Sequence, residues 1–422
     1  MKKIALVRNS TRFNSYQGLA DNAAAIEPPI WMMLKEQILK SQGREVFVID
    51  NEVECDDFHD VIDRLQFAKV DEVQIYPTGN HPSAYFQQRD GLNAFVDHLK
   101  QVFSEVNINY TLDFDPTDVE TNWGSFNLSQ YKAHNWHCDY GAIDRKPYGV
   151  IFTSISCPFK CNFCGIHSFY GDKYKERSLY YVMADIMKLV HQGVRTIKVM
   201  DELFFYRQGR VECLCDNIIS EDLDLNLWAY ARIDTINPQV LTKLRKAGFR
   251  WLGLGIESGN EGIRRESLKG SFNNAKIREV VKMVKDHDIK VGGNFIFGFP
   301  NETSETMQET LDFAMELKCE FTNLYSMMAY PDTELAHLAK INGWELPKSW
   351  SGYSQYSHDC HPIRTHHLTS SEVLKFRDHA FDTLYTDAGY LSYLEKIFGE
   401  IAIKSIKELT AIKLKRKLLN VS

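Results

Sequence analysis

Short apolar runs alternate with amphipathic stretches along the N-terminal quarter of the chain. Three runs rich in β-branched residues predict strands at Lys3–Arg8, Glu45–Asp50 and Glu72–Tyr76. Apolar positions at helical spacing between them predict helices at Pro29–Ser41 and Asp57–Phe67. Repeated strand–helix units predict a doubly wound, Rossmann-like α/β domain with a parallel sheet over residues 1–105. Such a sheet binds ligands in the loops after the carboxyl ends of its strands.

The same rhythm returns at Tyr148 and continues to about residue 345. Apolar runs predict strands at Gly149–Ser156, Thr196–Met200, Leu225–Tyr230, Trp251–Ile256, Val291–Phe297 and Thr322–Met328. Amphipathic stretches between them predict helices at Leu179–His191, Val211–Ile219, Pro238–Ala247, Ala275–Asp286 and Ser304–Leu317. Six strand–helix units are too few to close an eight-stranded barrel. We therefore expect a second α/β domain, over residues 148–345, with its chemistry at the carboxyl ends of the strands.

The segment between the two domains, residues 106–147, has weaker periodicity and is interpreted as a connector. Its centre, from Tyr131 to Cys138, is dense in side chains that stack, hydrogen-bond or bind metals. Two interpretations of this segment stay open. Either His134, Trp136 or His137 lines a cavity between the domains, or the segment is a buried staple that holds them together.

Residues 346–422 predict a mainly helical C-terminal extension. Its aromatic stretch Trp350–Ser357 has no clear period and forms either a substrate lid or a packed loop. The last twenty residues place lysines among isoleucines and leucines, which predicts a basic amphipathic helix. We expect this helix to pack on its own domain, with peripheral membrane contact as the less favoured alternative.

Three cysteines follow the first strand of the second domain in a C-x3-C-x2-C pattern: Cys157, Cys161 and Cys164. Thiolates gathered in such a loop can hold an iron–sulfur cluster. Structural zinc sites use four protein ligands, and electron-transfer clusters usually use four cysteines. Three cysteines without an obvious fourth partner leave one iron open to a substrate or cofactor. A zinc loop, or three unrelated buried thiols, is the alternative.

This spacing, with the aromatic residue Phe163 before the last cysteine, resembles the signature of the radical SAM superfamily. The resemblance implies that Cys157, Cys161 and Cys164 bind a 4Fe–4S cluster. It also implies that the open iron takes the amino and carboxylate groups of S-adenosylmethionine. The expected fold is then a partial (β/α)6 barrel, open on one side where substrates enter.

Polar motifs fall at the expected strand ends in the family's order. Asp201 or Glu202, after the second strand, matches the family position that accepts a hydrogen bond from the amino group of S-adenosylmethionine. Arg232, after the third strand, presents a fork suited to the carboxylate of the same cofactor. A salt bridge from Arg232 to Asp234 or Glu257 is the alternative role.

Two further strand ends extend the resemblance. The fourth strand ends in Glu257, Ser258 and Gly259, which in the family contact the sulfonium region or the ribose. The fifth and sixth strands lead into Asn294–Pro300 and Tyr330–Leu335, which resemble family patterns with single departures. We assign no catalytic acid or base to any of these residues.

The N-terminal domain resembles the cobalamin-binding domain that precedes many radical SAM barrels. The similarity rests on Pro28-Pro29, on the strand that ends in Val-Ile-Asp, and on the loop Pro77–Ala84. It implies that cobalamin contacts this loop through Thr78, Gly79, Asn80 and Ser83. No D-x-H-x-x-G pattern occurs, so no axial histidine is assigned, and His81 does not stand in that position. A relic domain that binds nothing is the alternative.

Composition narrows the class of protein further. A length of 422 residues predicts two or three domains, and 44% apolar with 25% charged residues is typical of a soluble globular protein. The net charge of −7 disfavours a dedicated nucleic-acid binder, and no apolar run approaches the roughly 20 residues of a membrane span. Arg8 interrupts the first apolar run, which favours a strand over a signal peptide. The six remaining cysteines are scattered, so we expect a reducing, cytoplasmic location.

Together these features predict a cobalamin-dependent radical SAM methyltransferase that acts on an unactivated carbon of a small polar or carbohydrate-linked metabolite. The expected partners are that substrate and an electron donor such as flavodoxin or ferredoxin, without nucleic acid or membrane. A radical SAM enzyme that catalyses a rearrangement or oxidation is the first alternative. A non-catalytic iron–sulfur electron-transfer or sensor protein is the second, and the polar motifs at the strand ends count against it.

Overall fold

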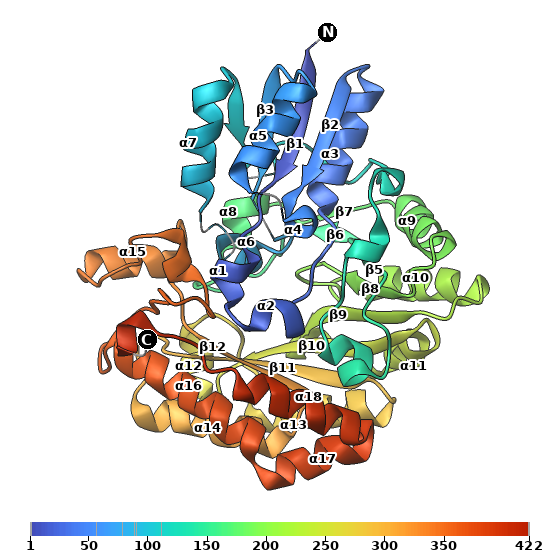
Figure 1. The fold of residues 1–422 in the computed structure, drawn as a ribbon. Coiled ribbons are helices and arrows are strands. Elements are labelled where there is room, and N and C mark those ends of the chain that lie inside the picture. The colour runs from blue at the N-terminus through green and yellow to red at the C-terminus, as the bar shows by residue number, and fades with distance from the viewer. Residues whose placement is uncertain are drawn as a thin grey trace.

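The computed structural model describes residues 2–55, 57–77, 79–87, 89, 91–110 and 112–420. Figure 1 shows an N-terminal α/β domain above a larger α/β domain, with the C-terminal helices packed against the larger one. This arrangement confirms the predicted order of an N-terminal doubly wound domain, a barrel-type domain and a helical extension.

The N-terminal domain contains a parallel sheet in the order β2-β1-β3-β4, formed by β1 (Lys3–Arg8), β2 (Glu45–Asp50), β3 (Glu72–Tyr76) and β4 (Val106–Ile108). The first three strands have the predicted bounds, whereas β4 lies beyond the boundary expected at residue 105. Both faces of β1 are buried, Ala5 and Val7 in one core cluster and Ile4 and Leu6 in another. Burial on both faces is what a doubly wound sheet requires.

The described helices of this domain are α1 (Arg12–Tyr16), α2 (Leu19–Asn22), α3 (Ile30–Ser41), α4 (Asn51–Glu54), α5 (Phe58–Phe67), α6 (Pro82–Gln87) and α7 (Leu92–Val102). Helix α5 begins after Asp57, whose carboxylate accepts hydrogen bonds from the backbone N–H groups of His59 and Asp60 at 2.8 and 2.9 Å. Helix α6 begins at Pro82, so the loop expected over Pro77–Ala84 is shorter than predicted. Proline suits a first helical turn because its missing N–H has no partner to lose there.

The second domain is built on a parallel sheet in the order β12-β11-β10-β9-β8-β5. Its strands are β5 (Tyr148–Ile151), β8 (Thr196–Val199), β9 (Asn226–Arg232), β10 (Phe249–Glu257), β11 (Lys290–Phe297) and β12 (Phe321–Ser326). The edge strands β5 and β12 are not paired with each other, so the sheet is a partial barrel that is open on one side. This confirms the predicted (β/α)6 architecture.

The predicted strand Gly149–Ser156 is the main difference from the expected elements of the barrel. It is divided into β5 and β6 (Ser154–Ile155), and β6 pairs antiparallel with β7 (Lys175–Glu176). The division has a local cause, because the backbone N–H of Thr153 donates to the carboxylate of Asp201 instead of to a neighbouring strand. The short β6–β7 ribbon brackets the cysteine loop.

The helices of the second domain are α8 (Ile166–Tyr170), α9 (Leu179–His191), α10 (Gln208–Ser220), α11 (Pro238–Lys246), α12 (Glu261–Glu266), α13 (Asn274–Asp286), α14 (Ser304–Leu317) and α15 (Glu334–Ile341). Each long helix buries one apolar stripe; in α13 the stripe is Ile277, Val280, Val281 and Val284. Strands β5 and β8 are buried on both faces and β9 nearly so, which explains their apolar runs, whereas β12 alternates between buried and half-buried residues.

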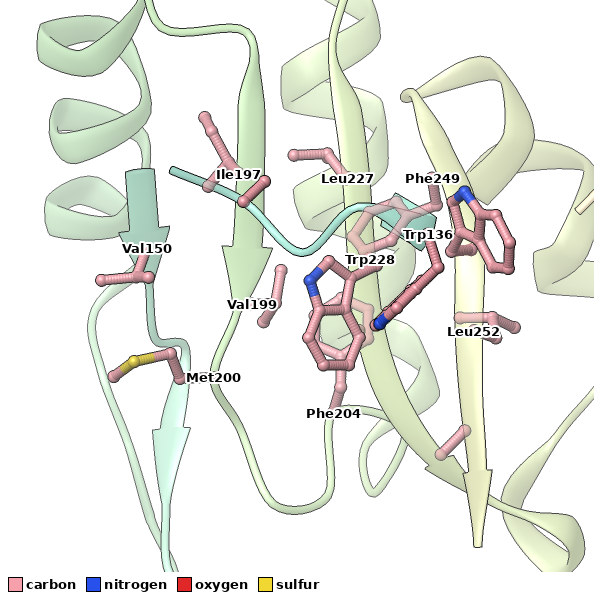
Figure 2. Close-up of a cluster of buried hydrophobic side chains, with 14 of the residues drawn as sticks. Trp136, Val150, Ile197, Val199, Met200, Phe204, Leu227, Trp228, Phe249 and Leu252 are labelled. Carbon is pink, nitrogen blue, oxygen red and sulfur yellow. The ribbon is translucent and has the colours of Figure 1, made fainter. Parts of the chain in front are cut away.

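Trp136 of the connector closes the amino end of the barrel. Its ring centroid lies 5.0 Å from that of Trp228, 5.1 Å from Trp251 and 4.9 Å from Phe321. Figure 2 shows it among the buried side chains of the barrel strands, next to Trp228. His137 is also buried, with its Nε2 atom 3.1 Å from the carbonyl oxygen of Asn226. Both interpretations of the connector therefore hold in part: Trp136 and His137 are buried at this end of the barrel, and His134 and Trp136 also line the cavity between the domains.

The C-terminal extension consists of α16 (Ser370–Thr386), α17 (Ala388–Phe398) and α18 (Glu400–Ala411), with short 3-10 turns at Trp350–Tyr353 and Lys417–Leu419. The basic helix predicted over the last twenty residues is wrong beyond Ala411. The chain becomes extended there because Arg416 turns inward, where its guanidinium donates to Asp378 at 3.0 Å and to the carbonyl oxygens of Gln355 and Ser357.

All nine cysteines are free thiols, which agrees with the absence of a disulfide pattern in the sequence. Within the described part of the chain, no helix combines the length and the apolar character needed to cross a membrane.

Candidate active site at the carboxyl end of the barrel

The three cysteines lie in a loop between β6 and α8, at the carboxyl end of the barrel sheet. The backbone N–H of Cys164 donates to the carbonyl oxygen of Cys161 at 3.1 Å, which closes a tight turn. Asn162 ties this turn to the end of α12, since its side-chain amide donates to the carbonyl oxygen of Glu266 at 3.1 Å. Phe163 ties it to the loop after β11 through a T-shaped contact with Phe299, at 5.6 Å between centroids. The neighbouring barrel loops therefore fix the cysteine loop.

The surroundings of the thiols suit a metal cluster. Burial raises the pKa of Cys157 to about 11 and also raises the pKa of Cys164, so a bound cation must displace these protons. Among the described residues, no three Cys, His, Asp or Glu side chains converge as a single metal ion requires. The thiolates of a 4Fe–4S cluster bind separate iron atoms and need not converge on one point. A mononuclear zinc site is therefore not formed among the described residues, and the binding of a cluster by these three cysteines remains a prediction.

The acidic pair after β8 is divided between two roles. Asp201 is buried, and its two oxygens accept hydrogen bonds from the Thr153 backbone N–H, the Thr153 hydroxyl and the Ser154 hydroxyl, all at 2.6 Å. Glu202 instead points toward the N-terminal domain, with its Oε2 2.7 Å from Nε2 of His81. Its Oε1 is buried and has no hydrogen-bond partner among the described residues. Glu202, not Asp201, thus keeps an oxygen available to a ligand.

Arg232, at the end of β9, is buried and already engaged. Its Nε and Nη2 atoms donate to the two carboxylate oxygens of Asp234, both at 2.9 Å. Its Nη1 lies 3.6 Å from Sγ of Cys161, and its guanidinium carbon lies 3.8 Å from the ring centroid of Phe159. The alternative salt bridge to Asp234 is therefore present, and the one to Glu257 is not: Glu257 pairs with Lys269 at 2.7 Å.

Ser258 and Gly259 pack against helix α14. The Ser258 hydroxyl lies 3.0 Å from the Thr310 hydroxyl, which also accepts a hydrogen bond from the backbone N–H of Gly259 at 2.9 Å. A Cβ atom on Gly259 would lie 2.6 Å from the carbonyl oxygen of Glu309, so the close packing requires glycine. Glu257 has a φ of 68°, an uncommon conformation that is typical of strained functional loops.

A cavity of about 240 Å³ lies between the two domains. The barrel floor contributes Trp136 and Trp228, and the carboxyl ends of β1 to β3 contribute Arg8, Glu52 and the segment Gly79–His81. Residues of α16 and α18, together with Tyr356, close the side on which the barrel sheet is open. Glu202 contacts His81 of the cavity wall, and its charge also acts on Cys157 and Cys164 of the cysteine loop.

Of the four residues predicted to contact cobalamin, Gly79 and Asn80 line the cavity. Gly79 lines the cavity with a φ of 91°, a conformation that favours glycine. Asn80 also lines it, but its amide donates to Glu27 at 3.2 Å and to the carbonyl oxygen of Pro28 at 2.8 Å. Thr78 lies outside the described residues, and so does the side chain of Ser83.

The sequence analysis missed a buried ion pair in the cavity wall. Nζ of Lys198, on β8, lies 2.7 Å from Oε1 of Glu27, in the segment before α3. His134 also lines the cavity; burial lowers its pKa to about 4, so its ring is neutral there. A signal for Lys198 existed, because a lysine inside an apolar four-residue strand is buried and needs a partner.

Comparison with known proteins identifies the barrel. Residues 151–314 match the family model of the Radical SAM superfamily. This part of the chain is therefore a radical SAM domain. The match confirms the resemblance predicted from the cysteine spacing and from the polar strand ends.

Relatives and solved structures extend the likeness. The chain is 29% identical over 244 residues to an uncharacterized methyltransferase of Pyrococcus horikoshii, covering 57% of this chain and 52% of that protein. It is 26% identical to the hopanoid C-3 methylase of Methylococcus capsulatus, covering 47% of this chain and 37% of that one. The chain thus spans about half or less of these curated relatives.

Two solved structures share the overall fold, N-terminal domain included. One is the radical S-adenosylmethionine methyltransferase TsrM of Kitasatospora setae with cobalamin and a [4Fe-4S] cluster bound, with a TM-score of 0.64, 15% identity, and coverage of 97% of this chain and 100% of that one. The other is the cobalamin-dependent S-adenosylmethionine radical enzyme OxsB, with a TM-score of 0.62, 12% identity, and coverage of 97% and 72%.

Proposed function

We propose that this protein is a cobalamin-dependent radical SAM methyltransferase that methylates an unactivated carbon of a small molecule. One observation carries the proposal: Glu202, whose charge acts on Cys157 and Cys164, lies 2.7 Å from His81, which lines the cavity below the N-terminal strand ends. A protein that used its cluster only for electron transfer would have no need of such a cavity.

Cys157, Cys161 and Cys164 would hold a 4Fe–4S cluster, and Glu202 would accept a hydrogen bond from the amino group of S-adenosylmethionine through its unpartnered Oε1. His81 holds the other oxygen, so the carboxylate is oriented before the cofactor arrives. When bound, the cluster and S-adenosylmethionine supply a 5′-deoxyadenosyl radical that abstracts hydrogen from carbon.

In this proposal cobalamin would rest on the N-terminal strand ends, at the cavity between the domains. The cavity wall there includes the small residues Ala23 to Ala25 and Gly79, which would let a macrocycle approach the backbone. Bound methylcobalamin supplies the methyl group. The aromatic residues Tyr230, Tyr325 and Tyr356 on the opposite side would keep water from the substrate carbon. The relatives named as methyltransferases support this assignment.

The test starts from protein purified without oxygen. We expect one 4Fe–4S cluster and one corrinoid per chain, and release of 5′-deoxyadenosine and methionine from S-adenosylmethionine on reduction. A protein that binds a cluster but takes up no corrinoid would overturn the methyltransferase assignment and leave another radical reaction, such as the cyclisation for which some relatives are named. If the protein binds a cluster but never cleaves S-adenosylmethionine, both the methyltransferase assignment and the alternative radical reaction would be overturned.

A further inference from the structure

We propose that Arg232 is a positioning residue that holds the cysteine loop and favours the reduced state of the cluster bound there. The inference rests on the cluster assignment in the proposed function. It differs from the role expected from the sequence, in which the guanidinium binds the carboxylate of S-adenosylmethionine.

Arg232 contacts the cysteine loop at two points. Its Nη1–H group points at Sγ of Cys161 at 3.6 Å, within the range of hydrogen bonds to sulfur. Its guanidinium plane also covers the ring of Phe159, which stands between Cys157 and Cys161 in the sequence, with 3.8 Å from the guanidinium carbon to the ring centroid. A single buried side chain thus orders both the loop and one cluster ligand.

The remaining donors of Arg232 fix its orientation. Asp234 accepts from Nε and Nη2 at 2.9 Å each, a fork-to-fork pair, and the carbonyl oxygen of Lys269 accepts from Nη2 as well. To bind a cofactor carboxylate with this fork, Arg232 would first have to release Asp234. The structure therefore assigns the fork to Asp234 and leaves only Nη1 facing the sulfur.

Four side chains in two ion pairs place charges near Cys161, and Glu202 adds a negative charge near Cys157 and Cys164. Arg232 pairs with Asp234, and Lys269 pairs with Glu257 at 2.7 Å. Of these four groups, Arg232 is the one with a hydrogen bond to the sulfur, and it is buried where screening by water is weak. Asp234 is more exposed and lies on the far side of the guanidinium, so it offsets only part of that positive charge.

The consequence for the cluster follows from charge. A low-potential one-electron donor adds one electron to the oxidised cluster, and no bond forms or breaks in that step. The added negative charge is stabilised by a nearby cation and by an N–H group that donates to a ligand sulfur, both of which raise the reduction potential of an iron–sulfur cluster. Arg232 provides both effects at Cys161.

The experiment is a redox titration of the reconstituted full-length protein, followed by paramagnetic resonance, with iron and sulfide content measured in parallel. In Arg232→Gln we expect the midpoint potential to become more negative, with at least a tenfold lower ratio of reduced to oxidised cluster at a fixed potential, equivalent to about 59 mV. In Asp234→Asn we expect the opposite shift, because the guanidinium charge is then uncompensated.

Arg245→Gln is the matched control. Arg245 also forms a two-contact pair with an aspartate, Asp288, at 2.9 and 2.7 Å, but this pair is exposed and lies at the amino end of the barrel. The midpoint potential of the cluster in Arg245→Gln should equal that of the unmodified protein. If Arg232 only stabilised the fold, the midpoint potentials of Arg232→Gln and Asp234→Asn would shift in the same direction or stay unchanged. Either result overturns the inference.

Cluster loss in Arg232→Gln is also decisive when it is read with two other variants. Arg232→Lys keeps the positive charge, so it should retain the cluster with a potential nearer to that of the unmodified protein. If Arg232→Gln loses the cluster, an upward shift in Asp234→Asn supports the inference and an unchanged potential overturns it. An unmodified protein without any cluster would instead overturn the proposed function.

Discussion

At the scale of single residues, the site separates groups that shape the loop from groups that remain available to ligands. Asp201 and Glu202 are adjacent in sequence, yet the first is fully hydrogen-bonded to Thr153 and Ser154 and the second keeps one oxygen without a partner. Within the cysteine motif, Phe163 packs onto Phe299 of the loop after β11, whereas the three cysteines are free thiols. Adjacent positions in one motif therefore predict different outcomes on mutation.

Replacing Cys157, Cys161 or Cys164 by alanine should abolish cleavage of S-adenosylmethionine, because three thiolates are needed to leave one iron open. Iron and sulfide analysis of anaerobically reconstituted protein, together with 5′-deoxyadenosine release, measures the effect. The control is Cys213→Ala, since Cys213 is an exposed free thiol on the outer helix α10. A full cluster in the triple alanine variant would show that the ligands lie elsewhere.

Glu202→Gln should weaken S-adenosylmethionine binding by about 1.5–3 kcal/mol, or roughly 10- to 150-fold, because a charge-assisted hydrogen bond to the ammonium is lost. Calorimetry on cluster-loaded protein measures this. Asp201→Asn should instead destabilise the fold by about 1–3 kcal/mol, since its carboxylate holds the chain between β5 and β6. Unchanged affinity in Glu202→Gln would remove this residue from the cofactor site.

At the scale of elements, buried charges tie separate segments together. Glu27 precedes α3 and Lys198 lies on β8, and their 2.7 Å ion pair joins the N-terminal domain to the barrel. Arg416 and Asp378 join the end of the chain to α16 in the same way. Such pairs cost desolvation, and a partner left alone costs more.

Lys198→Met should destabilise the protein by about 3–5 kcal/mol, because Glu27 stays buried without its cation. The double variant Lys198→Met, Glu27→Gln should regain much of that loss, since both charges are removed together. Urea unfolding followed by tryptophan fluorescence measures both variants. A double variant no more stable than Lys198→Met would mean that the pair does not act as a unit.

The loop after β11 carries another buried carboxyl group, that of Glu302, and burial raises its pKa to about 8. Its Oε2 accepts from the backbone N–H groups of Gly298 and Phe299 at 2.6 and 3.0 Å. A carboxyl group with a raised pKa binds its proton more tightly in the folded state. Its contribution to stability is therefore present at acidic pH and is lost as the pH rises from about 4.5 toward 8.

Glu302→Gln should reduce the pH dependence of folding stability between about pH 4.5 and about pH 8. The glutamine oxygen can still accept the two backbone hydrogen bonds, and the side chain no longer ionises. Thermal unfolding of both proteins, from about pH 5 to about pH 8, measures the difference. Parallel profiles for the two proteins would show that Glu302 does not titrate in this window.

At the scale of the whole molecule, the cavity exists only because four parts of the chain enclose it. The N-terminal strand ends, the connector, the barrel and the C-terminal helices all contribute to its wall. The Trp350–Ser357 segment is largely buried, and only Tyr356 of this segment is among the cavity-lining residues. The side on which the barrel sheet is open is thus covered by α16 and α18 more than by a separate lid.

Gly79→Trp should abolish corrinoid uptake while leaving the cluster in place, because the indole would fill the cavity on the N-terminal side. Gly43→Trp is the matched control: Gly43 has a φ of 74°, so it shares the backbone strain, but its added Cβ would meet nothing within 4 Å. Absorption spectra and corrinoid extraction measure uptake. Equal uptake by the two variants would place cobalamin elsewhere or nowhere.

The sequence by itself determined most of the strands and helices and the cysteine motif. Period-two and period-3.6 patterns placed β1, β2 and β3 at their observed bounds, because a doubly buried strand needs a short apolar run. The C-x3-C-x2-C spacing and the strand-end motifs resembled the radical SAM superfamily, and the match over residues 151–314 confirmed that resemblance. The site residues predicted from these motifs remain predictions.

Only the tertiary structure decided which polar side chains form hydrogen bonds or ion pairs, and which residues are their partners. Contacts between Glu202 and His81, Lys198 and Glu27, or Arg232 and Cys161 join residues far apart in the sequence, and no local pattern records them. The end of α18 followed the same rule: a continuous basic helical pattern stopped at Ala411 because Arg416 gains buried hydrogen bonds by leaving the helix. Helical spacing reports a preference of a few tenths of a kcal/mol per residue, and a buried guanidinium with several partners outweighs it.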